Sequence, residues 1–292
     1  MLMSILLHDA NELLKRDNVV LEEADCNELV YADDTLLLGS NTEHLQLYMD
    51  YIAQVGKEYG LALNWKKIEQ MNINCQNMHI HDALGDHITV KQSIRYLGAQ
   101  LHANGQLEAE IAQKIGLASQ EFKVLKRIWN HCNISIRFKF EIFTACVLQR
   151  LLYSLETAWL NKSLRNKLDG FYAKCLRQIL KISPSHISRV SNHYILQQFN
   201  AKPLSKTLLH RQLKLFGKIA RMPNEAIVRK VTFESGSLHP VTTKNKRRGR
   251  PRKTWTTELH KIAESFAQTS DLWNLVQNKQ AWELVIKKFC RE

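Results

Sequence analysis

The sequence has no long apolar run. No stretch of about eighteen consecutive apolar residues occurs, which is the length that a helix needs to cross a bilayer. The apolar start, Met1 to Leu7, is too short for a signal peptide and has no basic residues before it. We therefore expect neither a transmembrane segment nor secretion, and we predict an intracellular protein of the nucleus or the cytoplasm.

Paired cysteines are also missing. The chain has 6 cysteines, and none of them belongs to a C-x-x-C pair. A disulfide framework is not expected in a chain of 292 residues with such irregular spacing, which indicates a reducing compartment. A zinc site is not predicted either, because Cys290 stands alone near the C-terminus and His79 and His81 are better explained as surface polar residues.

Acidic residues become scarce in the second half of the chain. Residues 1–150 hold 14 Lys and Arg against 19 Asp and Glu, a net charge of −5, whereas residues 151–292 hold 27 against 9, a net charge of +18. The whole chain has a net charge of +13. Such asymmetry predicts a polyanionic partner for the second half. Phosphate backbones are the commonest partner of this kind, and an anionic membrane surface is the competing one.

Two adjacent acids, Asp33 and Asp34, follow Tyr31-Ala32 inside an apolar frame. Leu29 to Ala32 form one short apolar run and Leu36 to Leu38 another, which predicts a buried β-hairpin with the acids at its tip. Adjacent buried carboxylates are costly unless a cation offsets their charge. Mg²⁺ prefers oxygen ligands and often binds between protein carboxylates and phosphates. The alternative is a surface hairpin whose acids only serve the turn.

Two further motifs follow these acids. Gly60 to Glu69 reads Gly-Leu-Ala-Leu-Asn-Trp-Lys-Lys-Ile-Glu, and Ile94 to Leu101 contains Tyr-Leu-Gly. The order of these motifs resembles the reverse transcriptases of non-LTR (LINE-type) retrotransposons. In that family an acidic hairpin is followed by a helix, a "GL-x-hydrophobic-N-x-x-K" element and a "YLG" strand. The resemblance is to the C-terminal part of such a polymerase.

The resemblance implies catalytic roles for three of these residues. Asp33 and Asp34 would hold Mg²⁺ or Mn²⁺ for two-metal nucleotidyl transfer. Lys67 would protonate the leaving pyrophosphate, a task for which Lys66 is an equally basic neighbour. Ile68 stands where the family usually has threonine, and a solvated charged loop is the alternative explanation of both lysines.

The third motif would contact the primer. By the same resemblance, Tyr96, Leu97 and Gly98 form the strand that grips the primer end. A glycine at that place would let the backbone approach nucleic acid closely. An ordinary strand end explains these residues equally well.

A two-metal polymerase needs another carboxylate from an earlier strand. Only thirty-two residues precede Asp33, and their acids lie in polar sequence, whereas Ser4 to Arg16 predicts an amphipathic helix with Ile5 on its apolar side. We therefore expect a truncated RNA-directed DNA polymerase that is inactive alone, with an RNA template and a DNA primer or duplex DNA as partners and no membrane. The alternative is a non-catalytic basic nucleic-acid-binding protein derived from such an element.

The middle of the chain predicts helices. Apolar residues follow helical spacing from Gln106, from Ser135 to Trp159 and from Ser163 to Ile182, and Pro184 ends the third stretch. Helices in series form a small bundle, which the resemblance identifies as the polymerase thumb. Basic side chains of this region would face a duplex or only water: Lys123, Lys126, Arg127, Arg137, Lys139 and Arg150.

The last third holds two basic motifs. Arg211 to Pro223 predicts an amphipathic helix ended by proline, and seven of the ten residues from Lys244 to Lys253 are basic. The pair resembles the "R-x-L-x-x-x-G-x-x-x-R-M" helix and the "R-G-R-P-x-x-x-W" segment that close many non-LTR polyproteins. Gly249 and Pro251 prevent regular structure, so the second motif predicts an extended arm.

Both motifs predict nucleic-acid contacts. Arginines on an extended arm fit a narrow minor groove, and an AT-hook, a nuclear-import signal and a phosphate clamp are compatible with the same residues. The predicted contacts are Arg211, Lys214, Lys218, Arg221, Lys246, Arg247, Arg248, Arg250, Arg252 and Lys253. Two closing helices, at 254–266 and 272–289, would pack through Trp255, Trp273 and Trp282.

These patterns combine into an α+β fold. Residues 1–105 would form the C-terminal part of a polymerase palm that carries the acidic hairpin. Residues 106–200 would form a helical thumb-like bundle. Residues 201–292 would form a basic nucleic-acid-binding region of helices with a flexible arm at 240–254.

Overall fold

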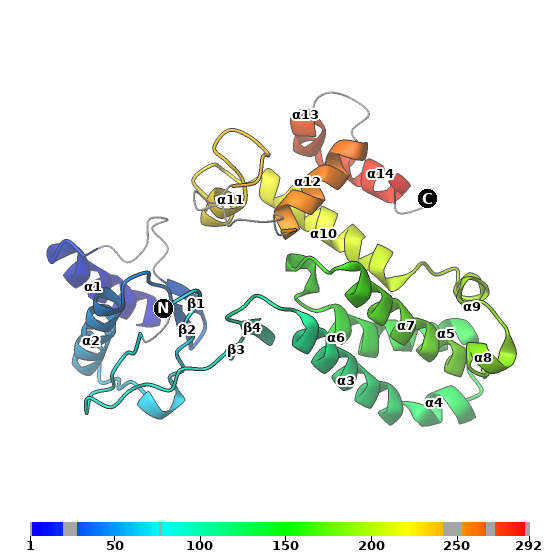
Figure 1. Cartoon of the computed structure of the whole chain (residues 1–292), viewed down its shortest axis with the longest axis horizontal. Coiled ribbons are helices and arrows are strands. Elements are labelled where there is room, and N and C mark those ends of the chain that lie inside the picture. The colour runs from blue at the N-terminus through cyan, green and yellow to red at the C-terminus, as the bar shows by residue number, and fades with distance from the viewer. Residues whose placement is uncertain (1, 20–27, 76–77, 242–252, 267–271, 290–292) are drawn as a thin grey trace. The chain divides into compact units, whose positions relative to one another are not determined.

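The computed structural model describes residues 2–19, 28–75, 78–241, 253–266 and 272–289. It is mostly helical and contains two small antiparallel sheets (Figure 1), which is compatible with the expected α+β class. The chain divides into two compact units, residues 1–106 and residues 107–292. Each unit contains its own hydrophobic clusters, so each has a core by itself.

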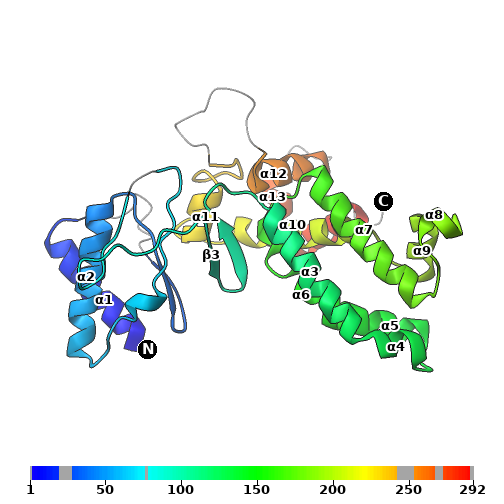
Figure 2. The same cartoon turned by 60° about the horizontal axis from the view of Figure 1, so that its bottom comes forward.

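The described part of the first unit contains two helices and two β-hairpins. Its elements are α1 (Leu2–Arg16), β1 (Glu28–Tyr31), β2 (Asp34–Leu37), α2 (Thr42–Glu58), the 3₁₀ turn η1 (Trp65–Lys67), β3 (Ser93–Tyr96) and β4 (Ala99–His102). Helix α1 confirms the helix predicted at Ser4–Arg16, and it packs against α2 (Figures 1 and 2). Leu6, Leu7 and Leu14 are buried between them, whereas Ile5 is exposed.

Tyr48 and Tyr51 of α2, and Tyr59 at its C-cap, donate hydrogen bonds to carboxylates that precede Asp33 in the sequence. The pairs are Tyr59 with Asp9, Tyr51 with Asp17, and Tyr48 with Glu28. Burial and the Glu28 carboxylate raise the pKa of Tyr48, so this phenol remains a protonated donor at neutral pH. These upstream acids therefore hold α1 and the start of β1 against α2.

The Gly-Leu pair of the second sequence motif ends α2. Gly60 adopts a φ of +71°, and the N–H of Leu61 donates to the carbonyl of Gly56 at 2.8 Å. This arrangement is a glycine helix stop, in which the left-handed residue is followed by an apolar residue that folds back. Leu61 packs against the α1–α2 core, so the chain leaves the helix at a fixed place.

The second unit begins with a helical bundle. Its elements are α3 (Glu108–Val124), α4 (Lys126–His131), α5 (Ile136–Phe143), the π-helical turn η2 (Thr144–Leu148), α6 (Gln149–Leu152), the 3₁₀ turn η3 (Leu155–Thr157), α7 (Lys162–Ile179), α8 (Ser185–Ser188) and α9 (Asn192–Gln198). The three predicted helical stretches are confirmed as helical. Helices α8 and α9 were not predicted, because segments this short carry too little periodicity.

A buried lysine corrects one expectation for the bundle. The ammonium of Lys139 lies inside and donates to the carbonyl of Trp129 at 2.9 Å. The indole of Trp129 donates in turn to the carbonyl of Phe122 at 2.9 Å and stacks on its ring. Lys139 therefore does not face a duplex. It joins α5 to α4, because a buried ammonium needs hydrogen-bond acceptors.

The chain continues as a group of helices around α10. These are α10 (Leu204–Ala220), α11 (Ile227–Thr232), α12 (Trp255–Phe266), α13 (Leu272–Gln277) and α14 (Lys279–Phe289). Figures 1 and 2 both show α12, α13 and α14 gathered around α10. The predicted closing helices are thus confirmed, and the second is split because the side chain of Asn278 accepts hydrogen bonds from the backbone of Gln280 and Ala281.

Trp282 fixes α14 to α10. Its side chain is 1% exposed, and its indole N–H donates to the carbonyl of Leu213 at 3.1 Å. The ring lies against Gly217, where an added Cβ would stand 2.2 Å from the indole nitrogen. The glycine of the α10 motif is therefore required by packing, because any side chain at this place would occupy the space of the indole.

The other two predicted tryptophan anchors also pack on neighbouring elements. Trp255 of α12 donates its indole N–H to the carbonyl of Glu156 at 2.7 Å. The ring of Trp273 in α13 lies 5.2 Å from the guanidinium of Arg229, which is itself buried and donates to the carbonyl of Ala220 at 2.6 Å. Tryptophans and a buried arginine thus connect α11, α12 and α13 to the rest of the unit.

We predict that Gly217→Ala lowers the free energy of unfolding by about 1–3 kcal/mol, because the new methyl group overpacks a fully buried contact. Gly170→Ala in α7 is the matched control, since an added Cβ there meets nothing within 4 Å. The control should gain about 0.5–1 kcal/mol from helix propensity. Urea denaturation measures both, and an equal response of the two variants would refute the packing role of Gly217.

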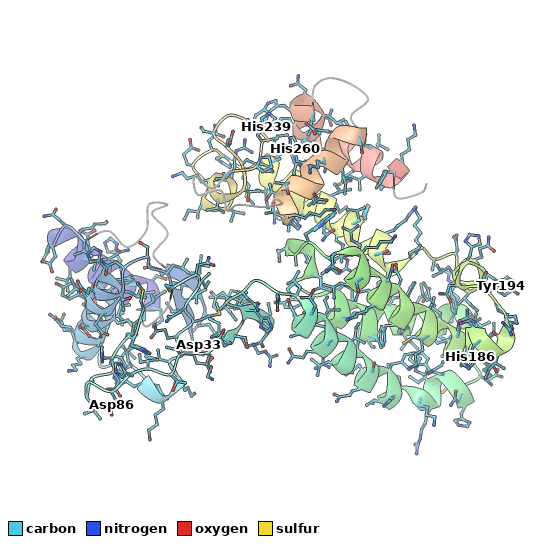
Figure 3. The ribbon with its side chains drawn as sticks, in the orientation of Figure 1. Asp33, Asp86, His186, Tyr194, His239 and His260 are labelled. Carbon is cyan, nitrogen blue, oxygen red and sulfur yellow. The ribbon has the colours of Figure 1, made fainter. Side chains whose placement is uncertain are left out.

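His260 gives this unit a pH dependence. It is buried in α12, its ring centre is 5.2 Å from that of His239 (Figure 3), and its Nδ1 lies 3.5 Å from Glu264. Burial lowers the pKa of His260, Glu264 opposes this effect, and His239 adds to it. The unfolded chain therefore takes up the proton first as the pH falls.

We expect the stability that His260 supports to be present above pH ~6.5, the ordinary histidine pKa, and to be lost as the pH falls through the lowered native value. Urea denaturation at neutral pH and near pH 5 should show a larger loss for the wild type than for His260→Gln. The same loss in both proteins would mean that another group controls the pH dependence.

Candidate metal and nucleic-acid site

The acidic motif forms the tip of a two-stranded hairpin. Strands β1 and β2 pair antiparallel with Tyr31 opposite Asp34, so Ala32 and Asp33 make the turn (Figure 3). Ala32 adopts a φ of +56°, a left-handed conformation that costs a non-glycine residue about 1–2 kcal/mol. The turn therefore stores backbone strain directly beside the two acids.

The hairpin is exposed, which corrects the prediction of a buried frame. Leu29 is 42% exposed and Tyr31 is 64% exposed. Apolar runs predict burial only if another layer covers them, and within the described residues no other strand pairs with β1 or β2. The hairpin formed as expected, but the apolar side chains of β1 face solvent, and Leu37 of β2 is only partly buried against the α1–α2 core.

The side chains of Asp33 and Asp34 are both exposed, and neither carboxylate forms a hydrogen bond or ion pair with a described residue. Their oxygens are therefore open to an oxygen-seeking cation. Among the described residues, no group of three or more His, Cys, Asp or Glu side chains gathers closely enough to hold a metal ion. Two carboxylates still suit Mg²⁺, because this ion often keeps several waters and takes further ligands from substrate phosphates.

Tyr96 connects the third motif to the acidic hairpin. Its hydroxyl donates to the carbonyl of Leu29 in β1 at 3.0 Å. Partial burial and the Asp34 carboxylate raise the pKa of Tyr96, so the phenol keeps the proton that it donates. The structure thus brings two residues singled out in the sequence, Asp34 and Tyr96, to one place.

Leu97 and Gly98 lie in a turn instead of a strand. Strand β3 ends at Tyr96, and the two residues that follow adopt φ values of +47° and +79° before β4 begins. Two successive positive φ angles are typical of a tight hairpin turn, where glycine is favoured. The turn geometry therefore explains Gly98 without a close approach of nucleic acid.

Lys67 lies on a different element from the acids. It ends the 3₁₀ turn η1 and is exposed, as is Lys66. No hydrogen bond or ion pair among the described residues joins either lysine to Asp33 or Asp34. Trp65 holds the turn in place by packing near Ile80 and Ile88. The structure therefore fixes the backbone that carries Lys67 and leaves its ammonium in solvent.

Of the four basic residues predicted to contact nucleic acid from α10 and its C-cap, two are exposed and two are hydrogen-bonded within the protein. Lys214 and Lys218 are exposed one helical turn apart. Arg211 donates to the side chain of Gln149 at 2.7 Å, and Arg221 donates to the carbonyl of Val276 at 2.8 Å. Arg221 therefore joins α10 to α13, which leaves the two lysines as the open cations of the predicted set on this helix.

The predicted arm at 240–254 lies only partly within the described residues. Lys253 lies 3.6 Å from Glu258 of α12, an ion pair at the end of the arm. Lys246, Arg247, Arg248, Arg250 and Arg252 lie outside the described residues. Their predicted contacts with nucleic acid stay predictions.

Sequence reasoning missed the buried arginines of the second unit. Arg177 and Arg229 are almost fully enclosed and donate to backbone carbonyls. Both stand in helical patterns where a basic residue is normally solvated, so no sequence signal predicts their burial. Arg177 fixes the backbone at Val190, and Arg229 fixes the end of α10 at Ala220.

Comparison with known protein families gives a match in the first part of the chain. Residues 1–101 match the family described as reverse transcriptase (RNA-dependent DNA polymerase). No curated protein and no solved structure matches the chain. The match includes the acidic hairpin and Tyr96, and it supports a reverse-transcriptase-like polymerase origin for this part of the chain. Among the described helices, none combines the length and hydropathy needed to cross a membrane.

We predict that Tyr96→Phe loosens the acidic hairpin. The loss of one hydrogen bond to Leu29 should reduce the local opening free energy of β1 by about 0.5–1.5 kcal/mol, which amide hydrogen exchange measures. Tyr31→Phe is the control, since its hydroxyl has no partner in the part of the chain that the structure describes. If the β1 amides exchange at the same rate in Tyr96→Phe as in the wild type, the Tyr96 hydroxyl does not stabilise β1.

Proposed function

We propose that residues 1–105 are the metal-binding end of the palm of a non-LTR retrotransposon reverse transcriptase. The observation that carries the proposal is the placement of Asp33 and Asp34. They are open at the tip of a hairpin that Tyr96 supports, inside the segment that matches the reverse transcriptase family. An exposed pair of carboxylates at a strained turn is suited to binding a cation.

In this proposal Asp33 and Asp34 hold Mg²⁺ or Mn²⁺. When bound, the ions stabilise the attacking and leaving oxygens of nucleotidyl transfer. The chain's own residues do the rest. Asp33 and Asp34 supply carboxylate oxygens from a turn whose backbone is already fixed, and Tyr96 keeps β1 in place through its hydrogen bond.

Lys67 would donate a proton from its ammonium to the leaving pyrophosphate. Its charge would also stabilise the negative charge that develops there. Lys67 makes no ion pair with a described carboxylate, so its ammonium is available for a phosphate. Tyr96, Leu97 and Gly98 would contact the primer end from the turn between β3 and β4.

The second unit would hold the nucleic acid. We assign residues 106–200 to a thumb and residues 201–292 to a basic nucleic-acid-binding region. The support is electrostatic, because residues 151–292 carry a net charge of +18. The same charge favours the second candidate function, a non-catalytic nucleic-acid-binding protein derived from such an element.

We further propose that the chain does not polymerise DNA alone. Asp9, Asp17 and Glu28, which precede Asp33 in the sequence, accept hydrogen bonds from tyrosines of α2 and its C-cap. They are therefore committed to packing the first unit. A complete two-metal site would need a carboxylate other than these.

Primer extension on an RNA template with Mg²⁺ tests the proposal. We expect no extension by the purified chain, together with salt-dependent binding of the same primer–template, because the basic unit binds phosphates without a complete metal site. Asp33→Ala and Asp86→Ala form a matched pair of variants, since both acids are exposed residues of the first unit (Figure 3).

Extension that Asp33→Ala abolishes and Asp86→Ala retains would show an active polymerase and refute the proposed inactivity. Absence of both extension and nucleic-acid binding would refute the nucleic-acid function as a whole. Binding without extension would fit the proposal.

A further inference from the structure

Residues 181–194 form the corner that follows α7 and contains α8 and the start of α9. The buried side chain of Arg177 holds this corner in place. This guanidinium is 6% exposed and donates to the carbonyl of Val190 at 2.7 Å and to the side chain of Asn192 at 2.8 Å. It also reaches the hydroxyl of Ser188 at 3.5 Å. A buried arginine that satisfies its donors in this way holds the loop between α8 and α9 in one conformation.

Two exposed cations of this corner occupy unusual backbone positions. Lys181 has a φ of +59° and Arg189 a φ of +57°. Glycine adopts this left-handed conformation freely, whereas residues with a Cβ do so at a cost. The corner therefore places two long basic side chains at positions where glycine would suit the backbone better. Residues with strained backbone conformations cluster at ligand-binding sites.

The same corner exposes rings and apolar surface. Tyr194 of α9 is 48% exposed and Ile187 of α8 is 65% exposed. The imidazoles of His186 and His193 are exposed beside them, and Figure 3 shows His186 and Tyr194 at this end of the bundle. The aromatic ring of Tyr194 is thus presented to solvent from a fixed helix.

Acids do not offset this charge. Asp169 is the only acidic residue between Glu156 and Glu225. Both of its carboxylate oxygens are already used, because they accept hydrogen bonds from the backbone and hydroxyl of Ser205 at 2.8 and 2.6 Å. On α5, which packs against α7, Glu141 is paired with Arg137 at 3.1 Å. The corner is therefore cationic.

We propose that the corner of residues 181–194 binds single-stranded nucleic acid. An unpaired base stacks on the ring of Tyr194, and neighbouring phosphates contact Lys181 and Arg189. A single strand is favoured over a duplex, because bases in a duplex already stack on one another and leave no face for a tyrosine. This inference deepens the proposed nucleic-acid function and rests on it.

Two variants test the proposal in the full chain. Tyr194→Ala should bind a single-stranded oligonucleotide roughly 5- to 150-fold more weakly, which corresponds to the loss of one stacked base. Arg189→Gly should also weaken binding and reduce the salt slope by about 0.7. Because glycine suits the backbone of residue 189, this variant should unfold at an equal or higher temperature than the wild type. Weaker binding by it therefore cannot come from unfolding.

Tyr153→Ala is the control for the aromatic variant. Tyr153 is 53% exposed in the same unit, and its ring already lies 5.6 Å from the ammonium of Lys114. Fluorescence anisotropy with a labelled single strand and with a duplex of the same sequence gives the affinities. Binding of the single strand should fall in Tyr194→Ala and stay unchanged in Tyr153→Ala.

The possible results separate the two proposals. If the wild type binds neither strand form, the proposed nucleic-acid function fails together with this inference. If the wild type binds nucleic acid and both Tyr194→Ala and Arg189→Gly bind equally well, only the inference is overturned. Binding to vesicles of phosphatidylcholine and phosphatidylserine that depends on Tyr194, without a Tyr194-dependent loss for the single strand, would also overturn it.

Discussion

The contact between Trp282 and Gly217 is the constraint on which the second half of the chain depends. The indole occupies the space that any side chain at residue 217 would need, and its N–H is bonded to the carbonyl of Leu213. This contact positions α14, and Arg221 adds α13 through the carbonyl of Val276. At the other end of α10, Asp169 of α7 binds Ser205, so a carboxylate stands at the positive end of the helix dipole. Helix α10 is therefore held along its length.

This arrangement changes the meaning of the basic motif on α10. Leu213, Gly217 and Arg221, spaced four residues apart, lie on the face that packs the closing helices. Lys214 and Lys218 lie on the exposed face. The motif at Arg211–Met222 therefore combines two faces of α10. One face packs against the closing helices, and the other exposes Lys214 and Lys218. The first unit has a similar division, because its tyrosine–acid pairs build the support while Asp33 and Asp34 remain open.

The sequence predicted the helices and the hairpin, because these depend on the spacing of apolar residues. It did not predict burial, which depends on whether another part of the fold covers a side chain. The helices α1, α7 and α10 follow from their apolar spacing, and the hairpin follows from short apolar runs around a turn. Its burial did not follow, because Leu29 and Tyr31 show the same pattern whether or not another surface covers them. The burial of Lys139 could not be predicted either, because its partner is a backbone carbonyl brought close only by folding. The tight turn at Gly98 was misassigned, because a strand end and a hairpin turn share the same residues.

The two ends of the basic arm have a consequence for the integrity of the chain. At its first residue, Pro240, the arm pairs with Phe233, and directly after it Trp255 binds the carbonyl of Glu156. Each end is thus attached to the second unit by its own contacts, and Trp282 attaches α14 independently. The peptide link across residues 242–252 is therefore not what keeps α12 to α14 on α10. A protease that cut the chain there would leave two fragments that behave as one particle in solution and separate only under denaturing conditions.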